Sequence, residues 1–150
     1  MAASPNRIHL TGLARKLVTD GVLEEPIAIQ AFQAALSAKT SFVKYLIDQK
    51  LSDSKTVAQA ASQEFGVSLI DIESLEIDPD VVKLVSEELI LRHHALPIFR
   101  RGNRVFIAVS DPTNLQALDE IKFHLGANTE AVLVEENKLK VAIEKSLAAT

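Results

Sequence analysis

The stretch LTGLARKLVTDGVLEE, residues 10–25, decides how the first part of the chain folds, because a related stretch follows it. The second stretch, KTSFVKYLIDQKLSDS, begins at Lys39 and ends at Ser54. When the two are aligned end to end, their apolar residues coincide, whereas Gly12 and Gly21 of the first stretch fall on Ser41 and Lys50 of the second. The coinciding pairs are Leu13 with Phe42, Leu17 with Leu46, Val18 with Ile47, and Val22 with Leu51. A duplicated helical unit explains this pattern, since any folded copy must keep its core positions.

The repeat predicts four short helices in residues 1–66, arranged as two helix–turn–helix units. Gly21 and Gly66 suit helix ends, and Pro26 suits the first turn of the second helix. The predicted caps are Thr40 or Ser41 for the third helix and Ser52 or Asp53 for the fourth. The residues predicted to face inward are Leu13, Leu17, Val18, Ile27, Ala31, Phe32, Ala35, Leu36, Phe42, Val43, Leu46, Ile47, Val57, Ala60, Ala61 and Phe65.

After Gly66 the apolar pattern changes its period, which predicts an α/β part over residues 67–150. The clearest signal is a β-hairpin, in which runs 95–99 and 104–109 flank the turn RRGN. The other predicted elements are a strand over 67–72, one helix or a pair of helical turns over 79–93, a helix with apolar residues Leu115, Leu118, Ile121, Phe123 and Leu125 behind a Thr113 or Asn114 cap, a strand over 129–136, and a closing helix.

The fold class is therefore α+β, with a four-helix duplicated subdomain followed by a small α/β subdomain. The second subdomain, residues 67–150, contains a three- or four-stranded sheet that includes the hairpin. No low-complexity linker separates it from residues 1–66, so we expect the two parts to pack together.

Composition and motifs exclude several functions. The net charge of -4 argues against a nucleic-acid surface, and the lack of cysteine excludes disulfides and thiolate metal sites. None of the five glycines forms a phosphate-binding loop or a dinucleotide fingerprint. No apolar run reaches the roughly 20 residues of a membrane span, and the N-terminal stretch MAASPNR lacks the apolar core of a signal peptide. We expect no catalytic residues and no metal site.

Two clusters leave alternatives open. His93 and His94 are adjacent, so their side chains diverge, and a helix C-terminus favoured by the dipole explains them better than a metal site does. Arg100 and Arg101 stand at the hairpin turn, where they could grip an anion or serve only solubility.

Several stretches along almost the whole chain resemble the N-terminal region of type IV pilus assembly (extension) ATPases, in the PilB/GspE superfamily. The stretches that carry the resemblance are residues 10–25, ASQEFGVSLIDIESL, ALDEIKFHLG, AVLVEENKL and, most specifically, VSEELILRHHALPIFRRGNRVFIAVSDPTN. The resemblance implies a fragment without a cofactor of its own. ATP and Mg would belong to ATPase domains beyond Thr150, in a homohexameric full-length protein.

Some members of this superfamily carry the related MshEN cyclic di-GMP-binding module, whose two tandem motifs have the spacing seen here. The resemblance implies that arginine, glycine and glutamine positions of each motif serve the ligand. We call the corresponding residues of this chain the ligand-side positions: Gly12, Ala14, Gly21, Ala35, Ser41, Val43, Lys50 and Glu64. Only Gly21 keeps the motif's residue type. Weak or absent binding of cyclic di-GMP is therefore expected.

The favoured interpretation is a non-catalytic regulatory docking domain. The resemblance implies two partner classes, a PilZ-type adaptor and an actin-like inner-membrane platform component, and a cytoplasmic location peripheral to the inner membrane. The candidate partner-binding residues are Leu13, Leu17, Phe32, Leu36 and Phe42. The alternative is a direct cyclic di-GMP sensor, whose candidate nucleotide-binding residues are Leu13, Leu17, Gly21, Phe42 and Leu46.

Overall fold

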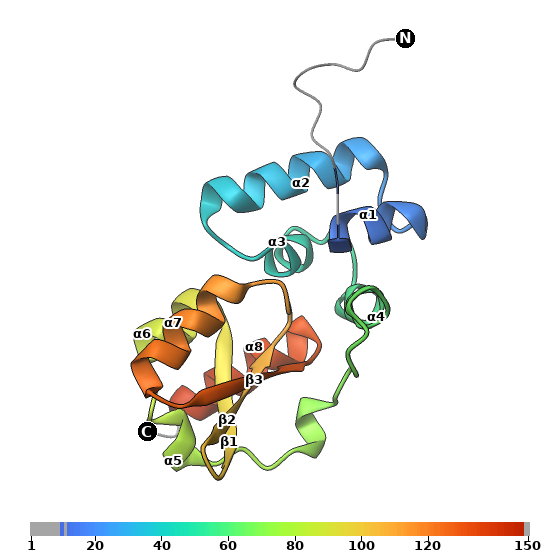
Figure 1. Ribbon diagram of the computed structural model, residues 1–150. Helices are drawn as coiled ribbons and strands as arrows, with labels where there is room; N and C mark the ends of the chain where they lie inside the picture. The colour runs from blue at the N-terminus through green and yellow to red at the C-terminus, as the bar shows by residue number, and fades with distance from the viewer. Residues whose placement is uncertain (1–9, 11, 149–150) are drawn as a thin grey trace.

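Four helices form the first part of the molecule, in the order that the repeat predicts (Figure 1). The computed structural model describes residues 10 and 12–148, so the segment MAASPNR lies outside the described residues. Each helix of the first pair has a counterpart in the second pair. The helices are α1 (Gly12–Thr19), α2 (Glu25–Ala38), α3 (Phe42–Asp48) and α4 (Ser54–Phe65).

The turns within the two helix pairs repeat the same backbone hydrogen bonds. The Val22 amide donates to the Leu17 carbonyl at 2.9 Å, and at the equivalent position of the second copy the Leu51 amide donates to the Leu46 carbonyl at 2.9 Å. The turn residues Gly21 and Lys50 both adopt left-handed backbone angles, with φ of 76° and 58°. The second copy therefore keeps the turn geometry although its glycine has become lysine.

This left-handed lysine gives a first prediction. Replacing Lys50 by glycine should raise the free energy of unfolding by up to about 1 kcal/mol, because glycine adopts positive φ without a steric penalty. Gly21→Ala is the matched change in the first copy, and it should lower that free energy by about 1 kcal/mol. Urea unfolding followed by circular dichroism measures both. Negligible effects of both changes would contradict an energetic cost of the left-handed backbone at these positions.

The predicted helix caps are confirmed. The Ser41 hydroxyl accepts the Lys44 amide at 3.0 Å, and the Asp53 carboxylate accepts the Thr56 amide at 3.2 Å. The hydrogen bonds from Thr56 lower the pKa of the Asp53 carboxyl below its ordinary value. Pro26 lies in the first turn of α2, and Gly66 ends α4 with φ of 64°.

The buried face of α2 differs from the prediction. Ala28, Ala31 and Ala35 are buried, whereas Ile27 is 38% exposed and Leu36 is 65% exposed. Small side chains let neighbouring helices approach α2 closely, so the alanine stripe faces the core in place of the larger residues beside it. The inward placement of Ile27 and Leu36 was therefore wrong, whereas that of Ala31 and Ala35 is confirmed.

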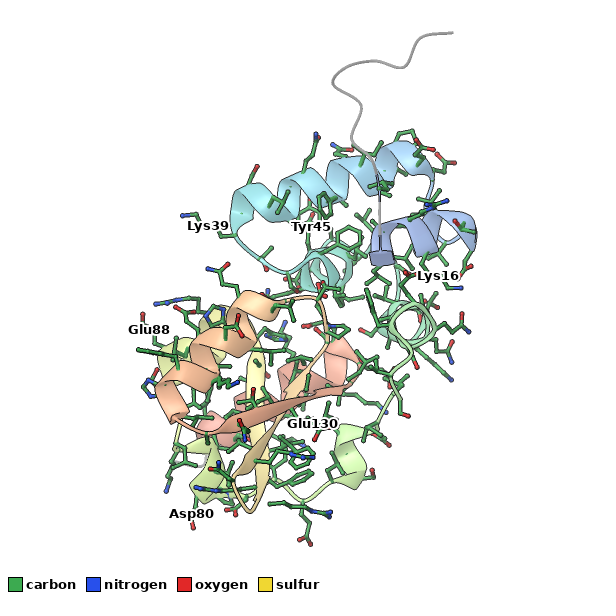
Figure 2. The ribbon with its side chains drawn as sticks, viewed as in Figure 1. Lys16, Lys39, Tyr45, Asp80, Glu88 and Glu130 are labelled. Atoms are coloured by element: carbon green, nitrogen blue, oxygen red, sulfur yellow. The ribbon has the colours of Figure 1, made fainter. Side chains whose placement is uncertain are left out.

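A three-stranded sheet forms the centre of the second part, in the order β1-β2-β3. Strand β2 (Arg104–Val109) pairs antiparallel with β1 (Ala95–Arg101) through the predicted hairpin and parallel with β3 (Asn128–Leu133). Arg104 Nη1 lies 3.0 Å from Glu130 Oε2 across the parallel pair, and Figure 2 labels Glu130 beside the hairpin. The remaining elements are η1 (Ile72–Ser74), α5 (Pro79–Val82), α6 (Glu87–His93), α7 (Leu115–Leu125) and α8 (Glu136–Ala148).

Two predicted strand boundaries were wrong. Residues 67–72 form no strand; Leu69 makes only an isolated parallel bridge with Leu133, and η1 starts at Ile72. Because α4 ends at Phe65, shortly before Leu69, the segment that follows it reaches β3 only at the end of that strand. There the Ile70 amide donates to the Leu133 carbonyl at 2.9 Å. Strand β3 ends at Leu133, because Glu136 already belongs to α8.

The helices around the sheet confirm most of the pattern. Residues 79–93 form a pair of short helices, α5 and α6, and Asn114 caps α7 by accepting the Ala117 amide at 3.4 Å. Within α7, however, Ala117 and Ile121 are buried while Phe123 is 91% exposed. Large apolar residues at helical spacing do not by themselves fix which side of a helix meets the sheet.

The two parts pack together as expected. Leu133 of β3 is buried in the apolar cluster of the helical part, and the Asn137 amide of α8 donates to the Ser54 hydroxyl of α4 at 3.2 Å. Lys138 of α8 contacts Glu135, Glu73 and Asp71, and these carboxylates raise the pKa of the Lys138 ammonium above its ordinary value. The division of the chain at residue 66 stays a prediction.

Candidate functional site

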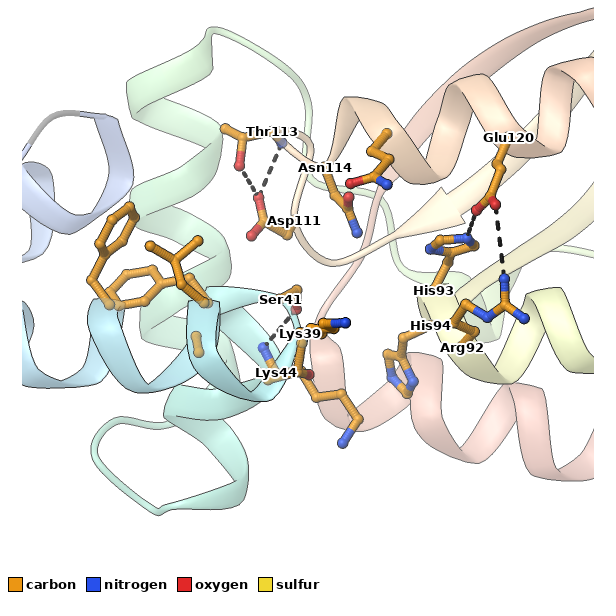
Figure 3. Close-up of a pocket in the computed structure, with 16 residues that line it drawn as sticks. Lys39, Ser41, Lys44, Arg92, His93, His94, Asp111, Thr113, Asn114 and Glu120 are labelled. Atoms are coloured by element: carbon orange, nitrogen blue, oxygen red, sulfur yellow. Dashed lines mark hydrogen bonds and ion pairs between the residues drawn. The ribbon is translucent and has the colours of Figure 1, made fainter.

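A hollow of about 810 Å³ lies where the helical part faces the α/β part (Figure 3). One wall comes from the end of α2 and the start of α3. The opposite wall comes from the end of α6, the loop after β2 and the first turns of α7. The volume is within the range of small-molecule pockets in proteins, and the hollow combines apolar with polar and charged residues.

The helical wall presents aromatic and basic side chains. Phe32 and Phe42 meet edge to face, with their ring centroids 5.9 Å apart, and Leu36 lies exposed on the same wall. Lys39 ends α2 in a left-handed conformation, and the Lys44 ammonium lies 2.6 Å from the Asp48 carboxylate. This wall therefore offers a partly open apolar surface with positive charge at its border.

The α/β wall is organised by hydrogen bonds within it. His93 contacts the Glu120 carboxylate of α7, and Arg92 Nη1 lies 3.8 Å from the same carboxylate (Figure 3). Asp111 is 7% exposed, and its Oδ1 accepts the Thr113 amide at 3.0 Å and the Thr113 hydroxyl at 2.5 Å. The loop after β2 thus holds a nearly buried carboxylate at the edge of the hollow.

Behind this wall, Glu136 joins two other polar side chains in the interior. Its side chain is 2% exposed; Oε1 accepts the Ser110 hydroxyl at 2.6 Å, and Oε2 lies 2.6 Å from His94 Nε2. His94 Nε2 is close enough to the Glu136 carboxylate for an ion pair, but the geometry of the contact is not that of a hydrogen bond. Because the carboxylate sits between the hydroxyl and the imidazole, the group does not have the nucleophile–base order of a hydrolase triad.

The histidine prediction is confirmed in its geometry. His93 is the last residue of α6 and His94 its left-handed cap, with φ of 51°. Their side chains diverge, one to Glu120 of α7 and the other to Glu136 of α8. Among residues 10 and 12–148, no group of three or more His, Asp or Glu side chains could hold a metal ion. No helix in the same residues is long and apolar enough to cross a bilayer.

The candidate binding residues separate into two groups. Leu13, Leu17 and Leu46 are at most 5% exposed and lie in the helical core. Phe32, Leu36 and Phe42 line the hollow. A partner that docks onto this conformation can therefore reach only the second group, and the binding role of these three residues stays a prediction.

The ligand-side positions are likewise divided. Ala35 and Ser41 line the hollow, so the end of the first motif and the start of the second do meet there. Ala14 and Val43 are buried, while Gly21, Lys50 and Glu64 are exposed outside its lining. Gly12 has φ of 60° and faces Phe65. A site assembled from all eight positions is not present as one surface of this hollow.

Sequence reasoning missed the polar residues on the α/β side. Ser110 and Asp111 directly follow the buried run of β2, and polar residues at a strand end are a recognisable signal of a site. Glu136 gave no comparable signal, because its partners Ser110 and His94 lie on other elements, far from it in the chain.

The fold defines a two-part module, in which a duplicated helical unit packs against an α/β unit. Comparison with known proteins agrees. The MshEN domain family matches residues 65–150, and the chain belongs to that family.

Two curated relatives are type IV pilus assembly ATPases. The type IV pilus assembly ATPase PilB of Pseudomonas aeruginosa is 39% identical over 138 residues, which is 92% of this chain and 24% of that protein. PilB of Acinetobacter baylyi is 31% identical over 140 residues, covering 93% of this chain and 24% of the relative. The chain thus spans about a quarter of the length of these relatives.

Two solved structures share the fold. A structure of MshE with cdg (cyclic di-GMP) superposes with a TM-score of 0.65 at 26% identity, covering 91% of this chain and 99% of that one. The N-terminal domain of XpsE superposes with a TM-score of 0.69 at 15% identity, covering 92% and 98%. Because the identity to XpsE is only 15%, this similarity shows a shared fold and nothing more.

Proposed function

We propose that this chain is the non-catalytic N-terminal regulatory domain of a type IV pilus assembly ATPase, and that it docks a protein partner. The observation that carries the proposal is the apolar surface of the hollow, where Leu36 is 65% exposed beside the Phe32–Phe42 pair. Exposed apolar side chains that adjoin one another are typical of protein interaction sites. Of the ligand-side positions, only Gly21 keeps the motif's residue type, which supports a protein rather than a nucleotide as the occupant.

The partner is a PilZ-type adaptor, with the inner-membrane platform component as the second partner class. In this arrangement the whole protein is a cytoplasmic homohexamer, peripheral to the inner membrane. ATP and Mg bind its ATPase domains and not the chain described here. The matches to PilB support only the assignment to a pilus assembly ATPase; the chain covers 24% of that relative, so this proposal leaves the ATPase domains to the rest of the protein.

Leu36→Asp tests docking. The substitution should weaken binding to a purified PilZ-type adaptor by about ten- to a hundredfold, since burying a leucine contributes about 1.5–3 kcal/mol. Because Leu36 is exposed, the far-ultraviolet circular dichroism spectrum should not change. Val141→Asp on α8 is the matched control, since Val141 is 47% exposed and outside the hollow. Unchanged binding by the Leu36 variant would contradict docking at this surface.

Direct sensing of cyclic di-GMP is the second candidate function. It is favoured by the meeting of Ala35 and Ser41 in the hollow and by the likeness to MshE, whose structure holds this ligand. The residues present there are a poor match for a nucleotide, because neither motif arginine remains to bind phosphate or stack on guanine.

Calorimetric titration separates the two functions. We expect no micromolar binding of cyclic di-GMP, because two arginines are absent and each charge-assisted bond contributes about 1.5–3 kcal/mol. The variant Ser41→Arg restores one motif residue at the hollow, and it should bind measurably more tightly than the natural sequence. Micromolar binding by the natural sequence would favour the sensor.

A further inference from the structure

Three consecutive residues at the start of α8 contact three different parts of the molecule. Glu136 contacts His94, which lines the hollow (Figure 3). Asn137 contacts α4 of the helical part, and Lys138 contacts carboxylates in and beside η1. We call residues 136–138 the α8 junction, because the hollow, the helical part and the α/β part meet there.

The contact between His94 and Glu136 is close but incomplete. His94 Nε2 lies 2.6 Å from the carboxylate, is buried, and makes no hydrogen bond with the described residues. A buried polar atom without a hydrogen bond carries a desolvation cost, which a well-aligned partner would remove. An occupant of the hollow that forms a hydrogen bond with the His94 ring therefore competes with Glu136 for this side chain.

The Glu136 carboxylate depends on its protein neighbours. Its side chain is 2% exposed, so water does not readily take the place of the imidazole. Of the two polar side chains that contact the carboxylate in the described part of the chain, only Ser110 would remain. Because polar interactions are strong in a low-dielectric interior, we expect the carboxylate to turn toward Ser110 and the backbone of the α8 junction to move with it.

The Asn137 amide responds directly to such a movement. It belongs to the first turn of α8, where backbone amides have no acceptor within the helix. Its acceptor is the Ser54 hydroxyl, at 3.2 Å, which is the upper end of the usual range. Ser54 is 7% exposed and begins α4, so this hydrogen bond joins the α/β part to the helical part. A small displacement at Glu136 is sufficient to break it.

We infer that the α8 junction couples the hollow to the contact between the two parts of the molecule. An occupant that draws His94 away from Glu136 should weaken the hydrogen bond between Asn137 and Ser54. The inference rests on the proposed use of the hollow as a binding site.

Hydrogen exchange of the Asn137 amide, followed by nuclear magnetic resonance, tests the coupling without any partner. His94→Asn removes the imidazole, and asparagine tolerates the left-handed backbone of this position, where φ is 51°. Exchange of the Asn137 amide should become about tenfold faster, as expected when one hydrogen bond is lost. Unchanged exchange at Asn137 would overturn the inference.

Two controls separate the coupling from a general loss of stability. His93→Asn is the matched variant, because His93 ends the same helix but contacts Glu120 of α7. It should change the exchange rate of Asn137 by less than a factor of about two. The amide of Ile107, a fully buried residue of β2, reports opening of the whole fold. If His94→Asn accelerated Ile107 and Asn137 equally, the effect would be global and the inference would fail.

The coupling should also be visible in the reverse direction, because energetic coupling between two sites is reciprocal. Ser54→Ala removes the acceptor of the Asn137 amide at a position outside the lining of the hollow. It should shift the ring signals of His94 and leave those of His93 in place. This variant decides the matter if His94→Asn does not fold, and unchanged His94 signals would contradict the coupling.

The PilZ-type adaptor separates this inference from docking itself. Adaptor binding should accelerate exchange of the Asn137 amide in the natural sequence. Binding that leaves this amide unchanged would overturn the coupling and leave docking intact. Absence of binding would count against docking, whereas the exchange rates and ring signals of the variants would still decide the coupling.

Discussion

Leu17→Ala and Leu46→Ala should each lower the free energy of unfolding by about 2–5 kcal/mol, the cost of deleting a buried leucine side chain. Both leucines are fully buried in the helical core, and they occupy equivalent positions in the two copies of the repeat. Each one also supplies the carbonyl that closes the turn after its helix. Because the environments match, we expect the two losses to agree within about 1 kcal/mol.

Urea unfolding followed by circular dichroism measures these losses. Leu115→Ala is the control, since Leu115 is 65% exposed and its truncation should change the free energy of unfolding by less than about 0.5 kcal/mol. A loss in one copy alone would mean that the other helix pair does not have the packing described. Since total stabilities are about 5–15 kcal/mol, the double variant should be largely unfolded or close to it.

Glu136→Ala should have a comparable effect for a different reason. The substitution leaves the Ser110 hydroxyl and the His94 imidazole without their carboxylate in the interior, which we expect to cost about 2–5 kcal/mol. Glu136→Gln keeps an oxygen acceptor and nearly the same volume, so its cost should be about 1–2 kcal/mol.

Thermal and urea unfolding of the two Glu136 variants give the comparison. Glu144→Ala is the control, because Glu144 is an exposed carboxylate on the same helix. If Glu136→Ala were as stable as the natural sequence, the buried carboxylate would have no structural role, and its position behind the hollow would then favour a binding role.

Local patterns were sufficient for much of the fold. The hairpin follows from two β-rich runs around Gly102 and Asn103, and the helix pairs follow from an apolar repeat. The caps at Ser41 and Asp53 are equally local, since each accepts an amide only three positions further on. Such features depend on neighbouring residues, so one sequence can reveal them.

Features that depend on distant residues were harder to predict. The buried face of α2 was predicted wrongly at Leu36, which was placed inward because it is large and apolar. Close packing of the neighbouring helices buries the smaller Ala28 and Ala31 instead. Residues 67–72 have strand-like composition, but their pairing is limited by where α4 ends. The exposed Phe123 follows the same rule, since the opposite side of α7 meets the core.

The candidate site shows the same division. Phe32, Leu36 and Phe42 were chosen from sequence and do meet at the hollow, whereas Leu13 and Leu17 are core residues. Glu136 joined its partners only through the folded arrangement of several elements, for which the sequence gives no spacing rule.

The burial of Leu133 in the helical cluster has a mechanical consequence. Swinging the two halves apart would withdraw this leucine into water, at a cost of about 1.5–3 kcal/mol. This contact between β3 and the helical cluster therefore opposes motion of the helical repeat relative to the sheet.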